Sequence, residues 1–480
     1  MKTHQIKLSS QTRQRSARLR AMDLPDIIGL ADCIEDARLA ALAKVPAPVE
    51  PNAYKPLLGR LKAALTKLPP LYRDTMILPF IDTLTKIGEA GFKRILRSDP
   101  QRQGAAGLMM DIAQAILQPA EGFAQAPTNA FEEVVSDLYD GFLSAEDRQG
   151  VNPPDLGVTP PLVKWGNPAF GPYTWPVDAT SSFGCKAAVV NLPPANARQG
   201  LVAWAALGHE TAGHDIIHAD TGLSDELASA LQQSLEPLGH ELDQYWSLRI
   251  DETSSDVMGI LNLGPTAGIG IIAYFRALNA AFTGQPKLRN EGLENDPHPA
   301  DILRGYLAAE TVALLKFTGS QSWAELIASE TDKDLDMIVL AGIAVSEKVA
   351  RQSAKIVAQT LVGYRAGALE NHALGEIQNW RDTDEDNVTL LRSILRSPGA
   401  PAIPNSPTIY AAHTVAAAVI EALADGSHVH SLFGRMVDIL NTMHSQNPAG
   451  GPLLIAHPSD ITRHFAFTGI HVGAKRARAR

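Results

Sequence analysis

Three histidines, one glutamate and two aspartates occur within the fourteen residues LGHETAGHDIIHAD, residues 207–220. Imidazole nitrogens and carboxylate oxygens are the groups that bind Zn2+ alongside thiolates. A glutamate beside such an ion can also act as the general base that takes a proton from water. This segment therefore predicts a metal site with a catalytic base, provided that the imidazoles can reach one ion.

The spacing of the histidines departs from the common HExxH pattern. His209 and His214 are five residues apart, whereas HExxH places its histidines four apart on one helix face. Positions five apart on a regular α-helix point roughly 140° away from each other. A π-bulge inserts one residue into a turn and would bring both rings onto one face. Gly213 makes this widening less costly, so we expect a π-bulge here.

A second acidic cluster follows in DETSSD, residues 251–256. Glu252 and Asp256 are four residues apart and would share one face of a helix. One carboxylate could bind a metal ion while its neighbour orients a ligand imidazole. The surrounding sequence is apolar, so these acids need partners in the folded protein.

The two segments together resemble the zinc sites of metallopeptidases with a glutamate as third ligand. HExxGH is similar to the zinc helix of the dipeptidyl-peptidase III family, in which a second helix carries the pattern acidic-Glu-x-x-x-acidic. The HExxxH element is also similar to that of peptidases grouped with the modulator of DNA gyrase. The resemblance covers residues 183–310 and is one of motif, not of the whole chain.

The resemblance implies a role for each residue of the two motifs. His209, His214 and Glu252 would bind Zn2+, and Glu210 would activate a metal-bound water. Residues around the ligands would orient the imidazoles or face the substrate, namely Asp251, Asp256 and His218. The implied activity is zinc-dependent hydrolysis of peptide or amide bonds, with a peptide or small amide as substrate.

Two further segments fit this resemblance loosely. In NDPHPADILRGYL (295–307), His298, Arg304 and Tyr306 are candidates for stabilising the oxyanion. KAAVVNL (186–192) is the best strand candidate, and it resembles the edge strand on which such peptidases lay an extended substrate.

Other interpretations of the same residues remain open. His214 and His218 are four residues apart and could form a metal pair without a bulge, with Asp215 as the base. The His-Asp pair at 214–215 is also similar to that of HD-type metal phosphohydrolases, in which His209 and Asp256 would complete the metal site. A non-enzymatic helical scaffold or interaction protein, with hydrogen-bonded histidines, is the third interpretation.

The elements that must position these residues are mostly helical, so we expect a mainly α fold. Apolar residues recur at spacings of three and four on both sides of a Pro- and Gly-rich stretch at 150–200. We expect a helical N-terminal domain at 24–150, a zincin-like helical domain with a small β element at 151–330 and a helical C-terminal domain at 331–470. Residues 1–23 and 471–480 would be basic tails, the first of them disordered.

Composition restricts the partners and the compartment. The net charge of −10 argues against nucleic acid as a partner, because phosphate binding favours a basic surface. The sequence contains no apolar run long enough to predict a membrane span. Two cysteines are too few for a disulfide framework and suit a reducing, cytoplasmic setting.

Overall fold

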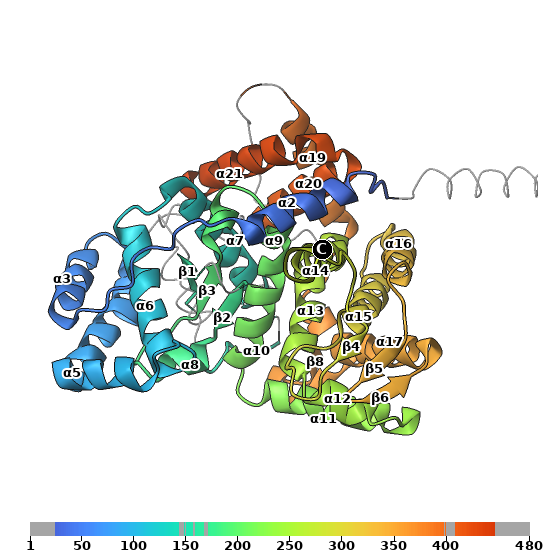
Figure 1. Cartoon of the computed structure of the whole chain (residues 1–480), viewed down its shortest axis with the longest axis horizontal. Coiled ribbons are helices and arrows are strands. Elements are labelled where there is room, and N and C mark those ends of the chain that lie inside the picture. Colours follow the sequence, from blue (N-terminus) through green and yellow to red (C-terminus); the bar gives the residue numbers. More distant parts are fainter. Residues whose placement is uncertain are drawn as a thin grey trace, which may run out of the picture.

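Helices build most of the molecule (Figure 1). The computed structural model describes residues 25–446, except for 144–147, 149, 157–158, 168–170, 398 and 400–408. The predicted tails and the end of the predicted C-terminal domain lie outside the described residues. The sheets of the described part have only two or three strands each. The predicted mainly α fold is confirmed.

A smaller hydrophobic core is formed mainly by the helices of residues 54–120. On α5 (Leu78–Ser98), Phe80, Leu84 and Phe92 are buried at spacings of four and eight, as an amphipathic helix requires. α6 is buried over most of its length because α3 covers one side and β1 another. The remaining elements here are α3 (Tyr54–Ala64), α4 (Pro70–Tyr72), the π-helix η1 (Arg73–Ile77), α6 (Ala105–Ala120) and α8 (Val177–Ser181).

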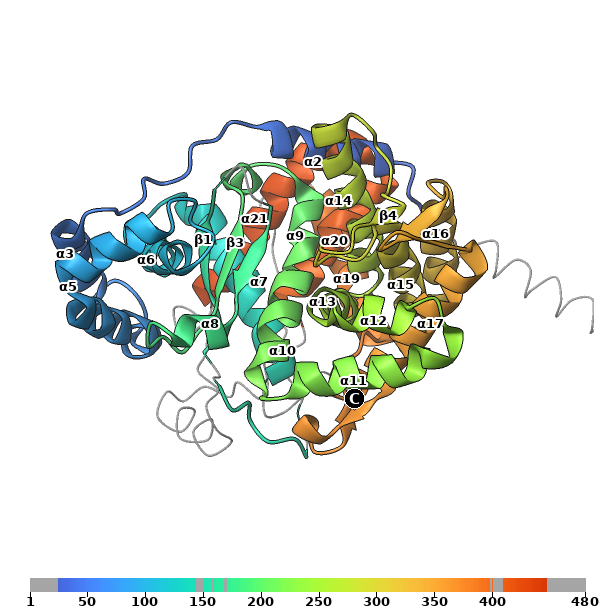
Figure 2. The ribbon, with the colours of Figure 1, turned by 60° about the horizontal axis from the view of Figure 1, so that its bottom comes forward.

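A three-stranded sheet lies between this smaller core and the rest of the molecule (Figure 2). β3 (Val189–Leu192) pairs in parallel with β1 (Leu162–Trp165) and antiparallel with β2 (Tyr173–Trp175). β3 is therefore the central strand, and the expectation that 186–192 forms an edge strand is wrong. Its VVNL sequence is buried throughout, which suits a strand with neighbours on both sides. The edge next to the predicted site is β2, which Pro172 and Pro176 limit to three residues.

A larger core holds most of the other helices. The metal-site segment is one continuous helical stretch that consists of α9 (Leu201–Leu207), the π-helix η3 (Gly208–Asp215) and α10 (Ile216–Ala219). It packs against α13 (Ile250–Leu263) and α14 (Pro265–Thr283), and α15 (Asp301–Ala313) packs on both of these helices. The outer helices on this side are α11 (Leu223–Leu235), α12 (Leu242–Ser247), α16 (Ser320–Asp332) and α17 (Glu347–Gly363).

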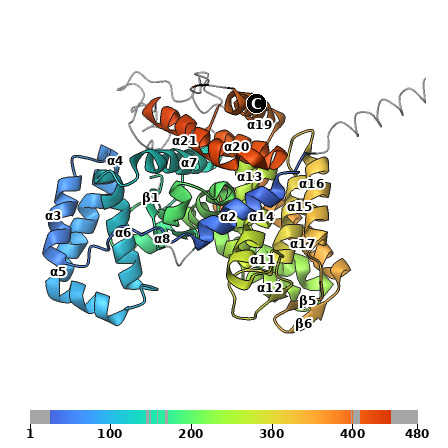
Figure 3. The ribbon, with the colours of Figure 1, turned by 45° about the horizontal axis from the view of Figure 1, so that its top comes forward.

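The last described helices cover the larger core on one side. Figure 3 shows α19 (Asp382–Arg396), α20 (Ala411–Ala424) and α21 (Val429–Gln446) next to each other, with α7 (Gln125–Leu143) below them. α20 is almost entirely buried because its many alanines allow neighbouring helices to approach closely. The remaining short elements are η2 (Pro194–Ala197), η4 (Glu236–Leu238), β4 (Glu291–Gly292), β5 (Ile338–Leu340), β6 (Ile343–Val345), β7 (Arg365–Ala366), η5 (Gly367–Leu369), β8 (His372–Ala373), α18 (Leu374–Ile377) and η6 (Gly426–His428).

The two cores divide the chain differently from the predicted domains. α2 (Leu30–Leu42) and α7 belong to the predicted N-terminal domain, yet both contribute to the larger core. α2 packs on α14, and α7 packs on α21. Among the described helices, none is both long and apolar enough to cross a bilayer.

Candidate metal centre

The segment with the predicted metal ligands is π-helical, as the five-residue spacing of its histidines requires. η3 runs from Gly208 to Asp215 between α9 and α10. This wider turn puts His209 and His214 on the same face, and their Nε2 atoms lie 3.0 Å apart. The expected π-bulge is confirmed, and it extends over the whole HETAGH motif.

Small residues allow α13 to cross η3 at very short range. A β-carbon on Gly213 would lie 2.4 Å from the Cα and Cβ atoms of Ser255. At the other end of the crossing, a β-carbon on Gly259 would lie 3.0 Å from the backbone nitrogen of His209. Gly213 is thus required for close approach as well as for local widening. The crossing brings Glu252 to the two imidazoles.

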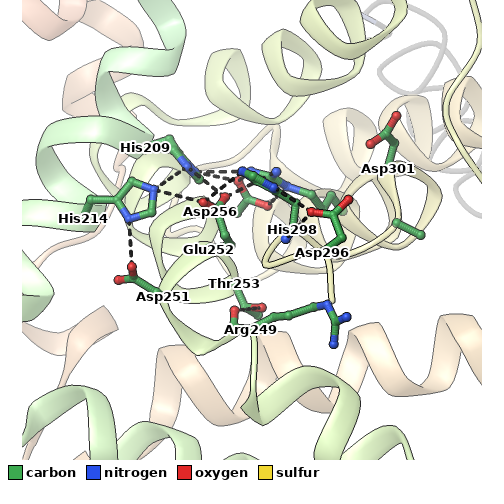
Figure 4. Close-up of polar contacts among 12 residues, drawn as sticks. His209, His214, Arg249, Asp251, Glu252, Thr253, Asp256, Asp296, His298 and Asp301 are labelled. Atoms are coloured by element: carbon green, nitrogen blue, oxygen red, sulfur yellow. Dashed lines mark hydrogen bonds and ion pairs between the residues drawn. The ribbon is translucent and has the colours of Figure 1, made fainter. Parts of the chain in front are cut away.

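His209, His214 and Glu252 converge on one point (Figure 4). The Nε2 atom of His209 lies 3.3 Å from Oε2 of Glu252, and that of His214 lies 3.4 Å from Oε1. Nδ1 of His209 lies 2.8 Å from Asp256, and Nδ1 of His214 lies 3.4 Å from Asp251. A proton on each Nδ1 would satisfy these carboxylates and leave each Nε2 lone pair free to bind a metal ion beside Glu252.

The electrostatics of this cluster favour an added positive charge. Burial opposes protonation of His209 and His214, but nearby carboxylates outweigh this effect and raise the pKa of both imidazoles. Burial likewise opposes ionisation of Glu252, yet contacts with both histidines hold its pKa well below the usual range. The site thus combines an ionised carboxylate with two imidazoles that attract a proton or a metal ion.

The three residues fit a divalent metal ion. Ligand atoms at the usual distances from a tetrahedral zinc ion lie roughly 3.3 Å from one another, close to the 3.0–3.4 Å separations seen here. Oε2 of Glu252 is buried, and no hydrogen bond among the described residues satisfies it. Nη1 of Arg304 lies 3.4 Å from this oxygen without forming a hydrogen bond, so the acceptor stays available to a bound metal ion. His209, His214 and Glu252 therefore could bind a metal ion.

Arg304 lies beside the candidate metal ligands, and other side chains of the protein fix its guanidinium group. Its Nε and Nη2 atoms each lie 2.7 Å from a carboxylate oxygen of Asp256, which in turn holds His209. Its guanidinium carbon lies 4.6 Å from the ring centroid of Phe275. Asp256 and Arg304 are both buried. Burial opposes ionisation of Asp256, but its contacts with Arg304 and His209 outweigh this effect and lower its pKa. Arg304 thus positions Asp256, in addition to lining the cavity.

His298 lies beside the ligand cluster. It is half-exposed in the cavity, and its Nε2 atom lies 3.3 Å from Oε1 of Glu252. Its Nδ1 atom lies 2.9 Å from Asp296, a residue that the motifs did not suggest. The contact with Asp296 fixes the ring orientation. The predicted position of His298 beside the centre is therefore seen in the structure.

Glu210 lies in the same cavity, next to the ligands, and is almost fully buried. The hydroxyl group of Thr174 on β2 lies 2.9 Å from Oε2 of Glu210 and 3.0 Å from its carbonyl oxygen. Thr174 was missed at the sequence level. In retrospect, the alternation in YTW places threonine on the strand face opposite the two aromatic residues.

β2 is held in place by a buried aspartate on α6. Asp111 accepts hydrogen bonds from the hydroxyl of Tyr173 at 2.7 Å and the indole nitrogen of Trp175 at 2.8 Å. Lys164 on β1 forms a buried ion pair with the same carboxylate. Asp111 stands alone in the apolar stretch GLMMDIAQAIL, which was the available signal for a buried polar contact.

Tyr306 does not reach the site, and its predicted role as an oxyanion donor needs correction. Its hydroxyl donates to Asp332 at 3.2 Å, and Arg351 stacks on its ring. Two residues along a helix correspond to a rotation of roughly 200°, so such residues point to nearly opposite sides of the helix. Because Arg304 faces the centre, Tyr306 must face away from it. The phenol in the cavity is instead Tyr274 on α14.

Tyr274 is another residue that the motifs did not suggest. It lines the cavity with Glu210, and no hydrogen bond to its hydroxyl is found among the described residues. Burial, followed by the negative charge of Glu210, raises its pKa, so that the hydroxyl keeps its proton and can donate it in a hydrogen bond.

His218 and Asp215 point away from the ligand cluster. His218 lies between Asp178 and Asp251, at 3.2 Å and 2.9 Å. Asp251 also approaches His214, so His218 contacts a residue that lies against a ligand candidate. Asp215 is buried and accepts a hydrogen bond from the backbone of Val177. This geometry disfavours a His214/His218 metal pair with Asp215 as base.

The site opens into a cavity of about 620 Å³. Its walls come from β2, α9, η3, α13 and α14, together with residues just before and within α6. The ligands and Glu210 form a polar part, and α14 contributes an apolar wall. This combination is typical of a binding site for an organic molecule.

The chain matches no protein-family model, and no curated protein or solved structure is significantly similar to it. The likeness to the dipeptidyl-peptidase III family therefore rests on the HExxGH and DExxxD motifs alone.

Proposed function

We propose that this protein is a zinc-dependent hydrolase of peptide or amide bonds. The observation that supports this proposal is the convergence of His209, His214 and Glu252 beside a buried Glu210 in one cavity. A zinc ion bound there would polarise a carbonyl group and make water more acidic. Two imidazoles and one carboxylate are a common ligand set for catalytic zinc.

The residues around the ligands would carry out the proton transfers. Glu210 takes a proton from the attacking water and delivers it to the leaving nitrogen. Thr174 orients the carboxylate of Glu210 through its hydroxyl group. His298 and Tyr274 face the same cavity and supply hydrogen-bond donors for the developing oxyanion. Asp251 and Asp256 keep the ligand imidazoles in the tautomer that leaves Nε2 free.

The charge of the cavity argues against a phosphate ester as substrate. Among the described residues that line it, the arginines are Arg102 and Arg304, and each is paired with an acid, Glu50 or Asp256. Phosphoryl groups are normally bound by cations with free donors. The HD-type interpretation is also weakened because Asp215 is turned away from the cavity.

The proposed setting is the cytoplasm. Cys33 and Cys185 are both buried and form no disulfide, which suits a reducing compartment.

The experiment that tests the proposal is metal analysis of the purified protein combined with a hydrolysis assay. We expect about one zinc ion per chain, and loss of peptide or amide hydrolysis on chelation with recovery on adding Zn2+. A scaffold protein would contain no stoichiometric metal. Hydrolysis of phosphate esters but not of amides would instead favour the phosphohydrolase interpretation.

A further inference from the structure

One wall of the cavity is apolar and comes from a single helix. Ile271, Tyr274, Phe275 and Leu278 of α14 line it at spacings of three and four residues, so that they form one continuous stripe. All four side chains are half-buried, although they lie on the inner side of the molecule. A stripe of large apolar side chains that faces a cavity marks a surface for an apolar ligand group.

The floor below this wall is made of small residues. Ala205 and Ala206 of α9 meet Ala267 and Gly270 of α14, and all four line the cavity. The helices are in close contact here, since a β-carbon on Gly270 would lie 3.1 Å from the Cβ atom of Ala205. These small side chains fill little of the cavity above the contact between the two helices.

The apolar wall adjoins the ligand cluster directly. Phe275 stacks under the guanidinium of Arg304, and Arg304 holds the carboxylate that orients His209. Tyr274, one residue earlier, lines the cavity with Glu210. An apolar group bound against α14 would therefore lie next to the position where the reacting bond must be held.

We infer that the substrate carries a bulky apolar side chain, such as that of leucine or phenylalanine, next to the bond that is cleaved. This side chain binds in the cavity against the apolar stripe of α14, above the floor of small residues. An acidic side chain is excluded because Glu210, Glu252 and Asp251 line the same cavity. The position of this side chain next to the cleaved bond rests on the proposed hydrolase function. The binding of an apolar side chain by this wall does not depend on it.

Binding can be measured separately from catalysis. The zinc-loaded Glu210→Gln protein would be titrated calorimetrically with acetylated pentapeptide amides of sequence Gly-Gly-Xaa-Gly-Gly, where Xaa is phenylalanine, leucine, alanine or aspartate. We expect the phenylalanine and leucine peptides to bind about 10-fold more tightly than the alanine peptide. The aspartate peptide should bind most weakly.

Two variants and a control locate the binding surface. Ala206→Leu fills the floor and should abolish the 10-fold preference, and Ile271→Ser should reduce it if the first variant does not fold. Phe282→Ala is the matched control, because Phe282 lies on the same helix but is 68% exposed and outside the cavity. Equal binding of all four peptides, or the same behaviour of Phe282→Ala and the folded cavity variants, would overturn the inference.

The outcomes separate this inference from the proposed function. Apolar preference without any hydrolysis by the zinc-loaded wild-type protein would leave the binding surface in place and refute the hydrolase. Hydrolysis without preference among the four peptides would support the hydrolase and refute the apolar subsite.

Discussion

Gly213 packs directly against Ser255 where the two helices of the candidate metal centre cross, since a β-carbon on Gly213 would lie 2.4 Å from the Cβ atom of Ser255. This contact sets how near α13 comes to η3. It therefore sets the separation between Glu252, which α13 carries, and the two histidines, which η3 carries.

Gly213→Ala should consequently weaken both the fold and the metal site. We expect a loss of about 1–3 kcal/mol in the free energy of unfolding from overpacking, together with lower zinc affinity. Chemical denaturation and competition with a chromogenic chelator measure the two effects. Gly59→Ala is the control, because no atom lies within 4 Å of the added carbon there. If Gly213→Ala binds zinc as well as the wild type does, the crossing does not define the site.

Glu210→Gln should separate metal binding from turnover. The amide cannot accept a proton from water, so we expect the rate of hydrolysis to fall by about 10²–10⁴-fold while zinc content stays near that of the wild type. The reason is that Glu210 belongs to the cavity but not to the ligand cluster. Steady-state kinetics and metal analysis of the same preparation provide the comparison. Retained turnover would remove Glu210 from the mechanism.

Asp251→Asn and Asp256→Asn should both lower zinc affinity by about 10–100-fold, because each carboxylate orients one ligand imidazole. Their effects on stability should differ. The Asp251 side chain is 49% exposed, whereas Asp256 is fully buried against Arg304. Asp256→Asn leaves the buried guanidinium of Arg304 with an uncharged partner, which should lower the free energy of unfolding by about 3–5 kcal/mol. Thermal unfolding measures the stability of the two variants, and zinc competition measures their affinity for zinc. Equal stability of the two variants would contradict this prediction.

Thr174→Val should reduce hydrolysis without changing zinc content. Valine has the same shape as threonine but lacks the hydroxyl that lies 2.9 Å from the Glu210 carboxylate. We expect a decrease in kcat of about 10-fold, consistent with the loss of a hydrogen bond to a charged group of about 1.5 kcal/mol. Thr174→Ser keeps the hydroxyl and should retain most of the activity. Equal activity of the two variants would argue against this orienting role.

Chelation should lower the thermal stability of the wild-type protein. A ligand that binds only the folded state stabilises it by about 2.7 kcal/mol at 100 times its Kd. In Glu252→Gln the same chelator should have a much smaller effect, because one ligand is lost while the fold is otherwise kept. Scanning calorimetry with and without zinc measures this difference. An unchanged melting temperature on chelation of the wild type would contradict metal binding at this cluster.

The ligand cluster could be predicted from the sequence because its members follow helical periodicity, once a π-bulge is allowed. His209, His214 and Glu252 were found in this way, and the structure brings them together. The same periodicity should have excluded Tyr306, since it cannot share a helix face with Arg304.

Two of the missed residues come from elements far away in the chain. Thr174 and Asp111 reach the site through the register of a three-residue strand and the packing of α6, and the local patterns at these residues do not show which partners they meet. The strand at 189–192 was expected, but its central place in the sheet depends on the pairing of β1 and β2. Long-range pairing of this kind is decided by tertiary contacts.

The carboxylate of Glu210 is oriented from one body of the molecule, while the metal ligands belong to the other. β2 is tied through Asp111 to α6 in the smaller core, and η3 and α13 lie in the larger core. A small displacement of one core relative to the other would therefore disengage Thr174 from Glu210 and leave His209, His214 and Glu252 unaltered. For the proposed hydrolase, occupancy by metal and competence for turnover would therefore be separately adjustable.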